Sequence, residues 1–542
     1  MTNRDVRDVE EVEWQFDVDD LVDVEAWLRE RSRAGDVQLH FLTPETHRDI
    51  YFDSADWRIF RAGYVLRART DAEGTRCEAT LKSFGTQGAL DKSLKVRREI
   101  TERLDVPEGT QTLARALARA PGTVGQHVRN VLGKHRLRSL FELTTNRHSV
   151  LVRRESVPIA EIALDDVRSE VDAPRSSVAL KRVEIEAALA LTPEASAVLH
   201  TFVENMQEAC VLHPASLSKF EAGLIAQDLD PRPANVPQQV GDDPTIGDLV
   251  FAMLRENFAQ FTARESGARM GEDIEHVHRM RVAIRKLRAA MSLFRNYLPA
   301  DNEPLRAELG WVASVLGAVR DLDVQLARVQ FWHSDDAVGK AGGIDAVALR
   351  NLEELLQAMR APAQTRLLRA LNSKRYSALL ANYEAMLRTG PSGDLAKRPA
   401  RSVLPALILK RYVKVREMGD AIDDASHADA LHALRIECKR LRYALEFATP
   451  LYAKAIRNFL PRLVELQDLL GEHQDAYVAI EQMQALAQTH KRELPAQTMQ
   501  AFDDIERRYA ASAQQLRSRF ARPYQRLKGK AWLGVQRALD HS

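Results

Sequence analysis

The chain has 542 residues, enough for two to four domains with a core each, and its hydrophobic fraction of 45% is that of a globular protein. The net charge of +1 conceals local bias, because the first fifty residues carry 14 acidic and 6 basic side chains. The three cysteines lie far apart, and no apolar run approaches the ~20 residues of a membrane span. These features exclude a disulfide framework, a zinc knuckle and a membrane partner, and we expect a cytoplasmic location.

Short segments of alternating polar and apolar residues dominate the chain up to about residue 225. Such period-two alternation is typical of strands with one polar and one apolar face. The clearest segments are residues 11–16, 65–69, 78–82 and 183–186. The sequence therefore predicts a mostly antiparallel β module in this part of the chain.

The polar faces of these predicted strands are charged, and in both signs. Carboxylates on one strand face repel one another unless a positive charge lies between them, and Mg²⁺ or Mn²⁺ would provide that charge while bridging to phosphate. A closed barrel with acids on some strands and bases on others would hold a metal–phosphate complex from both sides. The alternative is a sheet with one solvated, salt-bridged face. The acids are Glu11, Glu13, Glu161, Asp165, Glu184 and Glu186, and the bases are Arg67, Arg69, Lys82, Arg97, Arg147 and Lys219.

In chain order, these residues follow the motifs of a known family. Over residues 8–225 the chain resembles the CYTH superfamily of triphosphate tunnel enzymes. The resemblance implies an eight-stranded antiparallel tunnel that hydrolyses inorganic triphosphate, or a related triphosphate, with two divalent metal ions. The matching segments are Glu11-x-Glu13, Tyr51-Phe-Asp53, Arg67-x-Arg69, Thr80-Leu-Lys82, Arg97-x-Glu99, Glu161 with Asp165, Glu184-x-Glu186 and Ser218-Lys219.

The same resemblance assigns roles to the charged residues. It implies that Lys82, Arg67 and Arg69 neutralise the reacting triphosphate as catalytic cations. The remaining cations, Arg97, Arg147 and Lys219, are expected to bind substrate. The six acids (Glu11, Glu13, Glu161, Asp165, Glu184 and Glu186) are expected to hold Mg²⁺ or Mn²⁺.

Three positions depart from the family pattern. Gln15 replaces the lysine that closes the first motif, Thr101 replaces a glutamate and Ala222 replaces an arginine. Each lost charge-assisted contact is worth about 1.5–3 kcal/mol, which is compatible with a weakened enzyme, with another substrate or with a retired site. Because both E-x-E pairs are intact, we favour an enzyme. If the missing lysine limits the tunnel, Gln15→Lys should raise turnover or lower KM, unless another cation covers the role.

Residues 226–244 contain four prolines among polar residues, as is typical of a linker. After it, apolar residues recur with the helical period of 3.6 in long stretches rich in Ala, Leu, Arg and Glu. A break at residues 389–394, followed by Pro399 and Pro405, separates two halves. We therefore expect domains at residues 8–225 and 245–542, the second consisting of repeat halves at about 245–390 and 400–542.

The helical part contains one basic motif twice, at an offset of 154 residues. Its four positions stay within about 80° of one another on a helix, so each copy places its cations on one face. Residues 276–295 include six Lys or Arg and no acid, whereas a solvated helix face normally mixes both signs. Such a stripe fits a polyanion. The copies are His278, Arg281, Arg285 and Arg288, then His432, Arg435, Lys439 and Arg442.

A second element, Leu-Gly followed by an aspartate, repeats with the same offset and ends at Asp321 and Asp475. We expect each aspartate to orient a motif arginine. Together the two elements resemble the CHAD domain, which implies two pseudo-symmetric four-helix bundles and inorganic polyphosphate as the ligand. Nucleic acid is not expected, because the first copy has no aromatic residue on which bases could stack. The motif histidines lack a second metal ligand at i+3 or i+4, so anion contact or packing is expected of them.

The leading hypothesis is a two-part phosphate protein: a metal-dependent triphosphatase tunnel coupled to a polyphosphate-binding helical module. The alternative is a non-catalytic protein with a degenerate tunnel that localises to polyphosphate. A third hypothesis is adenylate cyclase or thiamine triphosphatase chemistry in the same tunnel. Association with polyphosphate granules is a further expectation.

Overall fold

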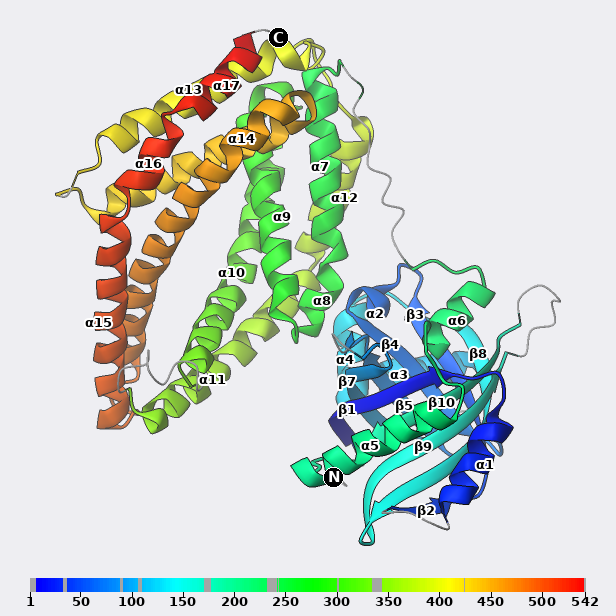
Figure 1. Cartoon of the computed structure of the whole chain (residues 1–542). Helices are drawn as coiled ribbons and strands as arrows, with labels where there is room; N and C mark the ends of the chain where they lie inside the picture. Colours follow the sequence, from blue (N-terminus) through cyan, green and yellow to red (C-terminus); the bar gives the residue numbers. More distant parts are fainter. Residues whose placement is uncertain are drawn as a thin grey trace. The chain divides into compact units, whose positions relative to one another are not determined.

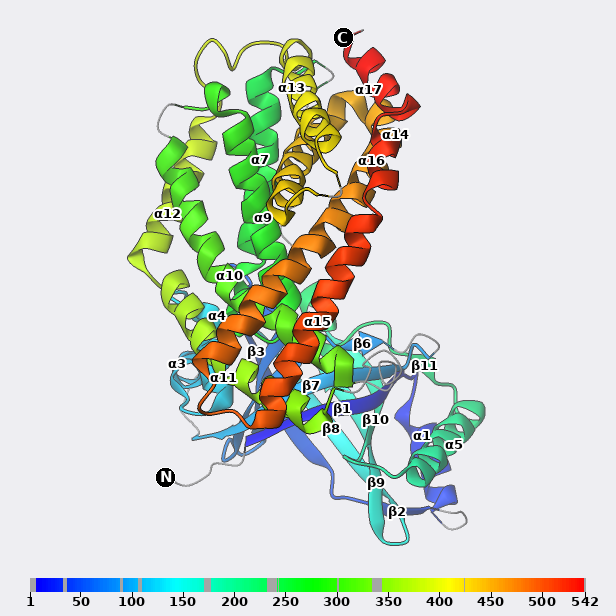
Figure 2. The same cartoon turned by 90° about the vertical axis from the view of Figure 1, so that its left-hand side faces the viewer.

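The structure is a computed structural model, and it describes residues 6–32, 37–87, 91–105, 110–169, 177–231, 241, 243–299, 302–333, 344–423 and 425–540. The chain divides into two compact units, Met1–Asn235 and Val236–Ser542. The first is built around a β-sheet and the second is helical (Figures 1 and 2). Residues 232–240 and 242 of the predicted linker lie outside the described residues.

Eight strands of the first unit form a closed antiparallel barrel, as predicted. Their order is β1-β10-β9-β8-β3-β4-β5-β7, and β7 pairs with β1 to close the ring. In a closed barrel alternate side chains face the lumen and the outside. The barrel strands are β1 (Val6–Asp17), β3 (Glu45–Ser54), β4 (Tyr64–Asp71), β5 (Cys77–Ser83), β7 (Leu94–Leu104), β8 (Leu137–Arg154), β9 (Val157–Arg168) and β10 (Ala179–Ala187); the shorter β2 (Gln38–Phe41), β6 (Thr86–Gln87) and β11 (His213–Pro214) pair with β8, β7 and β1.

The alternation along β1 shows how the sequence produces two faces. Trp14 and Phe16 are buried outside the ring, in a core that the strands share with α1 (Leu21–Arg31) and α5 (Pro193–Ala209). The polar Gln15 between them faces the lumen and is also buried. One strand thus supports an apolar core on one side and a polar site on the other. The other helices of this unit are α2 (Arg58–Arg61), α3 (Thr110–Arg119), α4 (Thr123–Leu132) and α6 (Lys219–Ala226).

Helix α6 explains why Ser218 and Lys219 matter for the tunnel. Ser218 is the N-cap, and its side chain and that of Glu221 form a capping box that satisfies the first backbone N–H groups. This start places Lys219 in the first turn, where it is buried. The next residue, Phe220, contacts the ring of Tyr51 at 5.5 Å between centroids. The local motif therefore anchors a lysine against the barrel.

The second unit repeats one helical pattern, as the basic motifs predict. In the first half α7 packs on α9, α9 on α10 and α10 on α11; in the second half α13 packs on α14, and α14 on α15 and α17. Helix α14 is kinked at Tyr452, so its two arms correspond to α9 and α10 of the first half. The helices are α7 (Ile246–Ala263), α8 (Glu265–Met270), α9 (Ile274–Leu293), η1 (Arg295–Tyr297), α10 (Asn302–His333), α11 (Ala346–Leu371), α12 (Lys374–Thr389), α13 (Ala400–Asp420), α14 (Ala428–Thr489), α15 (Ala496–Ser518), α16 (Ala521–Leu527) and α17 (Lys530–Asp540).

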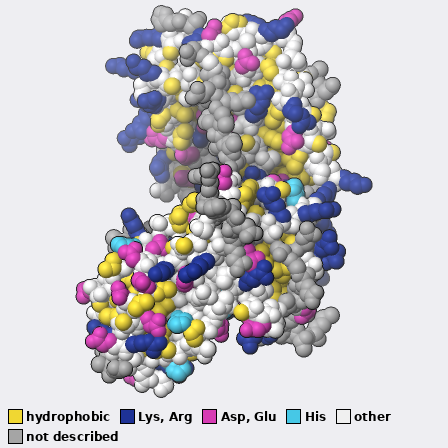
Figure 3. All heavy atoms as spheres, turned by 90° about the vertical axis from the view of Figure 1, so that its right-hand side faces the viewer, with side chains coloured by type: hydrophobic (Ala, Val, Ile, Leu, Met, Phe, Trp, Pro, Cys, Tyr) yellow, Lys and Arg dark blue, Asp and Glu magenta, His cyan; other side chains and the backbone are white. Residues whose placement is uncertain are grey.

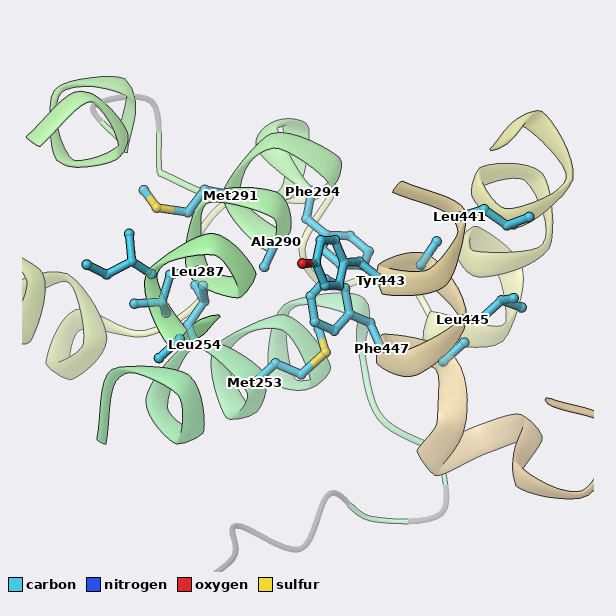
Figure 4. Packing of buried hydrophobic residues seen from close by; sticks show 14 of the residues in the cluster. Met253, Leu254, Leu287, Ala290, Met291, Phe294, Leu441, Tyr443, Leu445 and Phe447 are labelled. Atoms are coloured by element: carbon cyan, nitrogen blue, oxygen red, sulfur yellow. The ribbon is translucent and has the colours of Figure 1, made fainter. Parts of the chain in front are cut away.

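Both halves contribute to one apolar core. Phe294, the C-cap of α9, and Phe447 of α14 contact each other at 6.0 Å between ring centroids, close to Tyr443 (Figure 4). Pro405 was expected to belong to the break between the halves, but it lies inside α13, where packing maintains the helix. Within the described residues, no helix is long and apolar enough to cross a membrane.

Candidate functional site

Glu11 and Glu13 face the barrel lumen from β1 and are each 4% exposed. Lys82 of β5 lies between them, with its Nζ 2.6 Å from Glu11 Oε2 and 3.2 Å from Glu13 Oε1. Glu99 of β7 completes the group at 3.4 Å from the same nitrogen. The structure therefore brings the predicted E-x-E pair and the predicted catalytic lysine together in one cluster.

The close packing of these charged groups shifts the pKa values of Glu11 and Lys82. Burial raises the pKa of Glu11 to about 7, and Glu99 and Glu186 add to the rise while Lys82 opposes it. Burial would lower the pKa of Lys82, but Glu13, Glu99 and Glu11 raise it above its ordinary value. The single ammonium group of Lys82 thus lies against three carboxylates, and the cluster has fewer positive groups than acidic ones.

Asp165 of β9 is the centre of a second cluster and is fully buried. Arg147 of β8 donates to it from Nε and Nη2, at 2.8 and 2.7 Å, and Lys219 Nζ lies 2.5 Å away. Glu184 shares both cations, at 3.1 Å from Arg147 and 3.0 Å from Lys219. Burial would raise the pKa of Asp165, but Lys219 and Arg147 hold it below its usual range. Residues far apart in sequence thus meet in one cluster, in which the predicted metal acids and the predicted substrate-binding cations pair with each other.

Arg67 and Arg69 of β4 belong to a third cluster, around a residue that the sequence analysis did not select. Asp49 of β3 is fully buried and accepts from Arg69 Nε and Nη2 at 2.7 and 2.8 Å. Its other neighbour is Arg67, at 3.7 Å. Burial alone would raise the pKa of Asp49, but the two guanidiniums hold it well below its usual range. The signal available in the sequence was alternation, because Asp49 and Tyr51 lie two residues apart on one strand.

Of the two remaining predicted acids, Glu186 lies beside the first cluster, because it is opposite Glu13 in the register of β1 and β10 and adds to the rise in the pKa of Glu11. Glu186 pairs with Arg7 at 3.1 Å, and both side chains are well exposed. Burial raises the pKa of Glu186, while Arg7 opposes the rise. Glu161 lies opposite Glu186 in the register of β9 and β10. Four of the six predicted metal acids therefore belong to two clusters, and Glu186, with Glu161 opposite it, lies beside the first of them.

A cavity of about 350 Å³ lies in the barrel between the clusters. Four of the predicted cations line it, together with Glu184 and Gln15, whereas Arg69 and Arg147 are held by their carboxylates. One side of the cavity is aromatic: Phe84 is 44% exposed and contacts Phe60 at 4.8 Å between ring centroids. The lining cations are Arg67, Lys82, Arg97 and Lys219.

The donor chemistry of the first cluster fits a hard divalent cation. Mg²⁺ and Mn²⁺ take carboxylate oxygens, and the raised pKa of Glu11 reports a shortage of positive charge beside it. No group of three or more His, Cys, Asp or Glu in the described part of the chain has metal-binding geometry as it stands, because Lys82 occupies the space between the carboxylates. The residues fit a metal once the lysine turns toward a phosphate.

In the helical unit each basic motif lies on one helix, α9 or the first arm of α14. Arg281 Nη1 donates to Asp321 at 3.1 Å, and Arg435 Nη2 lies 3.7 Å from Asp475. The two aspartates thus hold equivalent arginines, as expected for an orienting role. Arg285 Nε donates to the hydroxyl of Tyr443 at 2.8 Å, so the two halves meet at the motifs.

A cavity of about 430 Å³ lies between the two motif helices. Seven cations line it and, within the described residues, no carboxylate does. His278, His432, Arg435 and Arg442 do not line it, and Arg442 donates to Glu446 at 2.6 Å. The lining cations are the predicted Arg281, Arg285, Arg288 and Lys439, and the unpredicted Arg306, Arg411 and Arg440.

The cations of this cavity repel one another. Burial lowers the pKa of Lys439 to about 8, and Arg435 and Arg285 contribute to the decrease. Burial also lowers the pKa of His278, helped by Arg320. On the face drawn in Figure 3, by contrast, Lys and Arg side chains lie scattered among acidic and apolar ones. Four of the seven lining cations pair with acids that lie outside the lining: Arg281 with Asp321, Arg306 with Glu303, and Arg411 and Arg440 with Glu437. Among the described residues, no carboxylate lies within 4.0 Å of the charged groups of Arg285, Arg288 and Lys439, so the lining is suited to an anion.

Comparisons with known proteins agree with this organisation. The model of the CYTH domain matches residues 10–221, and that of the CHAD domain matches residues 252–484. A protein of Mycobacterium tuberculosis (strain H37Rv), described as uncharacterized, is 30% identical over 253 residues, which cover 44% of this chain and 46% of that protein. The chain thus matches about half the length of this relative.

Solved structures resemble each unit separately. The CHAD domain from the plant Ricinus communis is 26% identical and has a TM-score of 0.45, covering 53% of this chain and 94% of that one. A protein from Hippeastrum, described as a candidate adenylyl cyclase with a dominant triphosphatase activity, is 15% identical with a TM-score of 0.30. The match covers 41% of this chain and 97% of the Hippeastrum chain.

Proposed function

Since the chain carries a CYTH domain followed by a CHAD domain, we propose that its tunnel hydrolyses inorganic triphosphate, or a related triphosphate, with the help of Mg²⁺ or Mn²⁺. One observation supports this most directly. The closed barrel arranges Arg67, Lys82, Arg97 and Lys219 around a single cavity beside buried carboxylates.

The ion pairs of the lumen account for the joint need for metal and substrate. Lys82 pairs with Glu11 and Glu13 in the structure, and Lys219 pairs with Asp165. When these cations turn to phosphate oxygens, the carboxylates lose their partners and become available to a divalent ion. A bound Mg²⁺ or Mn²⁺ would supply charge that polarises the terminal phosphoryl group. We therefore expect metal and triphosphate to bind cooperatively.

The residues of the chain provide binding and orientation. Arg67 and Arg97 offer fixed guanidinium forks, which suit the non-bridging oxygens of a phosphate. Asp49 holds Arg67 and Arg69 in place, so these arginines are oriented before the substrate arrives. Burial of the clusters strengthens every charge interaction with the substrate.

The test is phosphate release from tripolyphosphate with Mg²⁺ or Mn²⁺, compared between wild type and Glu11→Ala/Glu13→Ala. We expect the double variant to lose at least about a hundredfold in kcat/KM, since two buried ligands disappear. The matched control is Glu10→Ala/Asp19→Ala, which removes two exposed acids from the same strand region. Wild-type release no faster than that of the double variant would favour the alternative, a non-catalytic protein with a degenerate tunnel.

An organic triphosphate is the second candidate substrate. The exposed ring of Phe84 and its neighbour Phe60 lie beside the phosphate-binding cations, where a planar group could stack. Inorganic triphosphate has no apolar surface for these rings. Phosphate release from tripolyphosphate, ATP and thiamine triphosphate, measured for wild type and for Phe84→Ala, distinguishes an inorganic from an organic substrate. Selective loss of activity toward the organic substrates would identify one of them as the preferred substrate.

For the helical unit we propose binding of inorganic polyphosphate in the cavity between α9 and α14. Its seven cations lie without carboxylates in a lining that offers no free aromatic face, because the hydroxyl of Tyr443 is engaged by Arg285 and its ring packs near Phe447. A thin, flexible chain of phosphates fits these properties better than a duplex or a stacked base does. By the same chemistry the protein would concentrate at polyphosphate granules in the cytoplasm and bring its tunnel to a source of phosphoanhydrides.

A further inference from the structure

Lys95 of β7 is a buried cation of the lumen that no predicted motif contains. It is 6% exposed and lies on the same strand face as Arg97, two residues on. Among the described residues, no carboxylate oxygen lies within 4.0 Å of its Nζ, whereas Lys82, Lys219 and the other lumen cations each have such a partner. A buried ammonium without a counter-charge is costly unless a ligand provides one.

The hydrogen bond of Lys95 is made to Gln15. Its Nζ donates to Gln15 Oε1 at 2.7 Å, and Arg97 Nη2 donates to the same oxygen at 3.4 Å. Gln15 stands where the sequence motif of β1 lacks its expected lysine. Lys95 lies close by because β7 pairs with β1, with Lys95 opposite Glu13. Barrel closure therefore brings a cation to position 15 from the neighbouring strand.

Gln15 connects this cation to the cavity. It lines the cavity and is 3% exposed. Because its amide oxygen accepts from Lys95, its nitrogen points the other way and donates to Glu184 Oε1 at 3.4 Å. Its backbone is fixed as well: its N–H donates to Ser93, and its carbonyl accepts from the N–H of Ala215. The amide therefore has one orientation, which presents donor hydrogens to the lumen.

We propose that Lys95 is a positioning residue for the triphosphate, supplying through Gln15 the positive charge that the first strand lacks. This inference rests on the proposed function of the tunnel. Lys95 fixes the amide and polarises it, and the Gln15 nitrogen makes the contact with a phosphate oxygen. Glu13 and Glu221 lie near Lys95, but among the described residues no carboxylate oxygen lies within 4.0 Å of its Nζ, so its charge stays available to the substrate.

Two substitutions can move the positive charge from β7, which carries Lys95, to β1, which carries Gln15. Lys95→Gln should raise KM for tripolyphosphate about tenfold with a smaller change in kcat, because ground-state and transition-state binding lose the same charge. Gln15→Lys alone should give no gain, because two ammonium groups would lie within hydrogen-bonding reach of each other. The exchanged variant Gln15→Lys/Lys95→Gln should recover KM to within about threefold of wild type, with the lysine now on β1.

Lys92→Gln is the matched control, since Lys92 is exposed three residues earlier and should leave KM unchanged. Thermal melting identifies any variant that fails to fold, and Lys95→Arg then serves as the substitution that retains the charge. Binding of tripolyphosphate in EDTA, measured by calorimetry, should be weaker than with metal, because no ion compensates the released acids, but it should follow the same order of variants without turnover. If wild type hydrolyses tripolyphosphate but the exchanged variant has a KM no lower than that of Lys95→Gln, the proposed role of Lys95 is wrong, while the proposed function of the tunnel stands. If wild type neither hydrolyses nor binds tripolyphosphate, both the proposed function of the tunnel and the proposed role of Lys95 are wrong.

Discussion

The two cavities of this protein use the same residue types in opposite ways. In the tunnel nearly every cation lies against a carboxylate, as Lys82 does with Glu11 and Arg147 with Asp165. In the helical cavity seven cations gather with no carboxylate in the lining, within the described residues. In the tunnel the paired acids face the lumen beside the cations, whereas in the helical cavity the acids that pair with Arg281, Arg306, Arg411 and Arg440 lie outside the lining and Arg285, Arg288 and Lys439 have no such partner among the described residues. Arginine and lysine alone therefore do not reveal what kind of phosphate site a protein has; the partner acids do.

This difference has consequences for selectivity. A ligand of the tunnel exchanges existing ion pairs for new ones, so binding requires a match in geometry and a metal that compensates the released acids. A ligand of the helical cavity meets a lining that holds cations and, among the described residues, no carboxylate, so binding depends on charge density and falls steeply with salt. We expect polyphosphate binding to persist in EDTA and to weaken with salt far more than triphosphate binding does.

The largest effect is expected from removing the field of the helical cavity. Replacing Arg281, Arg285, Arg435 and Lys439 by Ala should weaken binding of long-chain polyphosphate by at least a thousandfold, on the order of 1.5–3 kcal/mol for each charge-assisted contact. Fluorescence anisotropy with labelled polyphosphate in EDTA measures this, and circular dichroism should show unchanged helix content. The control replaces four exposed cations elsewhere in the unit, Arg366, Arg369, Lys454 and Arg457. Equal loss in the control would mean that net charge, rather than the cavity, binds the chain.

The second prediction concerns the neutralised character of the tunnel. Asp49→Ala should destabilise the barrel by roughly 3–5 kcal/mol, because it leaves Arg67 and Arg69 buried without their acid. Thermal unfolding followed by near-ultraviolet circular dichroism checks this. The surface pair Asp8–Arg98 of the same barrel provides the comparison, and Asp8→Ala should cost no more than about 1 kcal/mol. Similar costs for both would contradict the view that buried pairs organise this lumen.

The third prediction uses the shortage of positive charge at Glu11, whose pKa burial raises to about 7. A metal must displace the proton, so Mn²⁺ affinity should rise with pH up to about 7 and change little above it. Below that pH the affinity should fall by up to about tenfold per unit. Calorimetric titration at pH 6, 7 and 8 measures the slope. Glu11→Gln should bind more weakly and lose most of this dependence; an unchanged slope would place the titrating group elsewhere.

The smallest effect is expected at Lys439, whose pKa burial and the neighbouring Arg435 and Arg285 lower to about 8. A lowered lysine pKa means that charge is lost as pH rises through about 8, so polyphosphate affinity should decline by about three- to tenfold between pH 7 and 9.5. Lys439→Arg stays charged over this range and should show a flat profile. A decline that persists in Lys439→Arg would assign it to another group.

Much of the fold was accessible from local patterns. Period-two alternation identified strands such as β1 and β4, since a barrel wall needs an apolar outer face and a polar inner one. The duplicated motif identified the repeated helices α9 and α14, because equal spacing on equal helices produces equal faces. Pro405 shows the limit of such reasoning, since its helix is maintained by packing.

Only some of the residues of the two sites could be predicted from the sequence. Asp49 and Lys95 carry no motif, and their importance depends on the strands beside them. Arg411 belongs to α13 and reaches a cavity between two other helices. Arg442 follows the repeat perfectly, yet it bonds to Glu446 and does not line the cavity. The repeat indicates the helix face, but only four of its eight residues, Arg281, Arg285, Arg288 and Lys439, line the cavity.

The sequence by itself determined which residues face inward along each strand and helix, because side-chain direction follows from the local backbone repeat. It also determined the division into a β module and a duplicated helical module. Only the tertiary structure decided which charges meet. The partners of Asp165 come from β8 and α6, and those of the Gln15 amide come from β7 and β10. Such pairings arise from barrel closure and register, which depend on the whole ring and on no single segment.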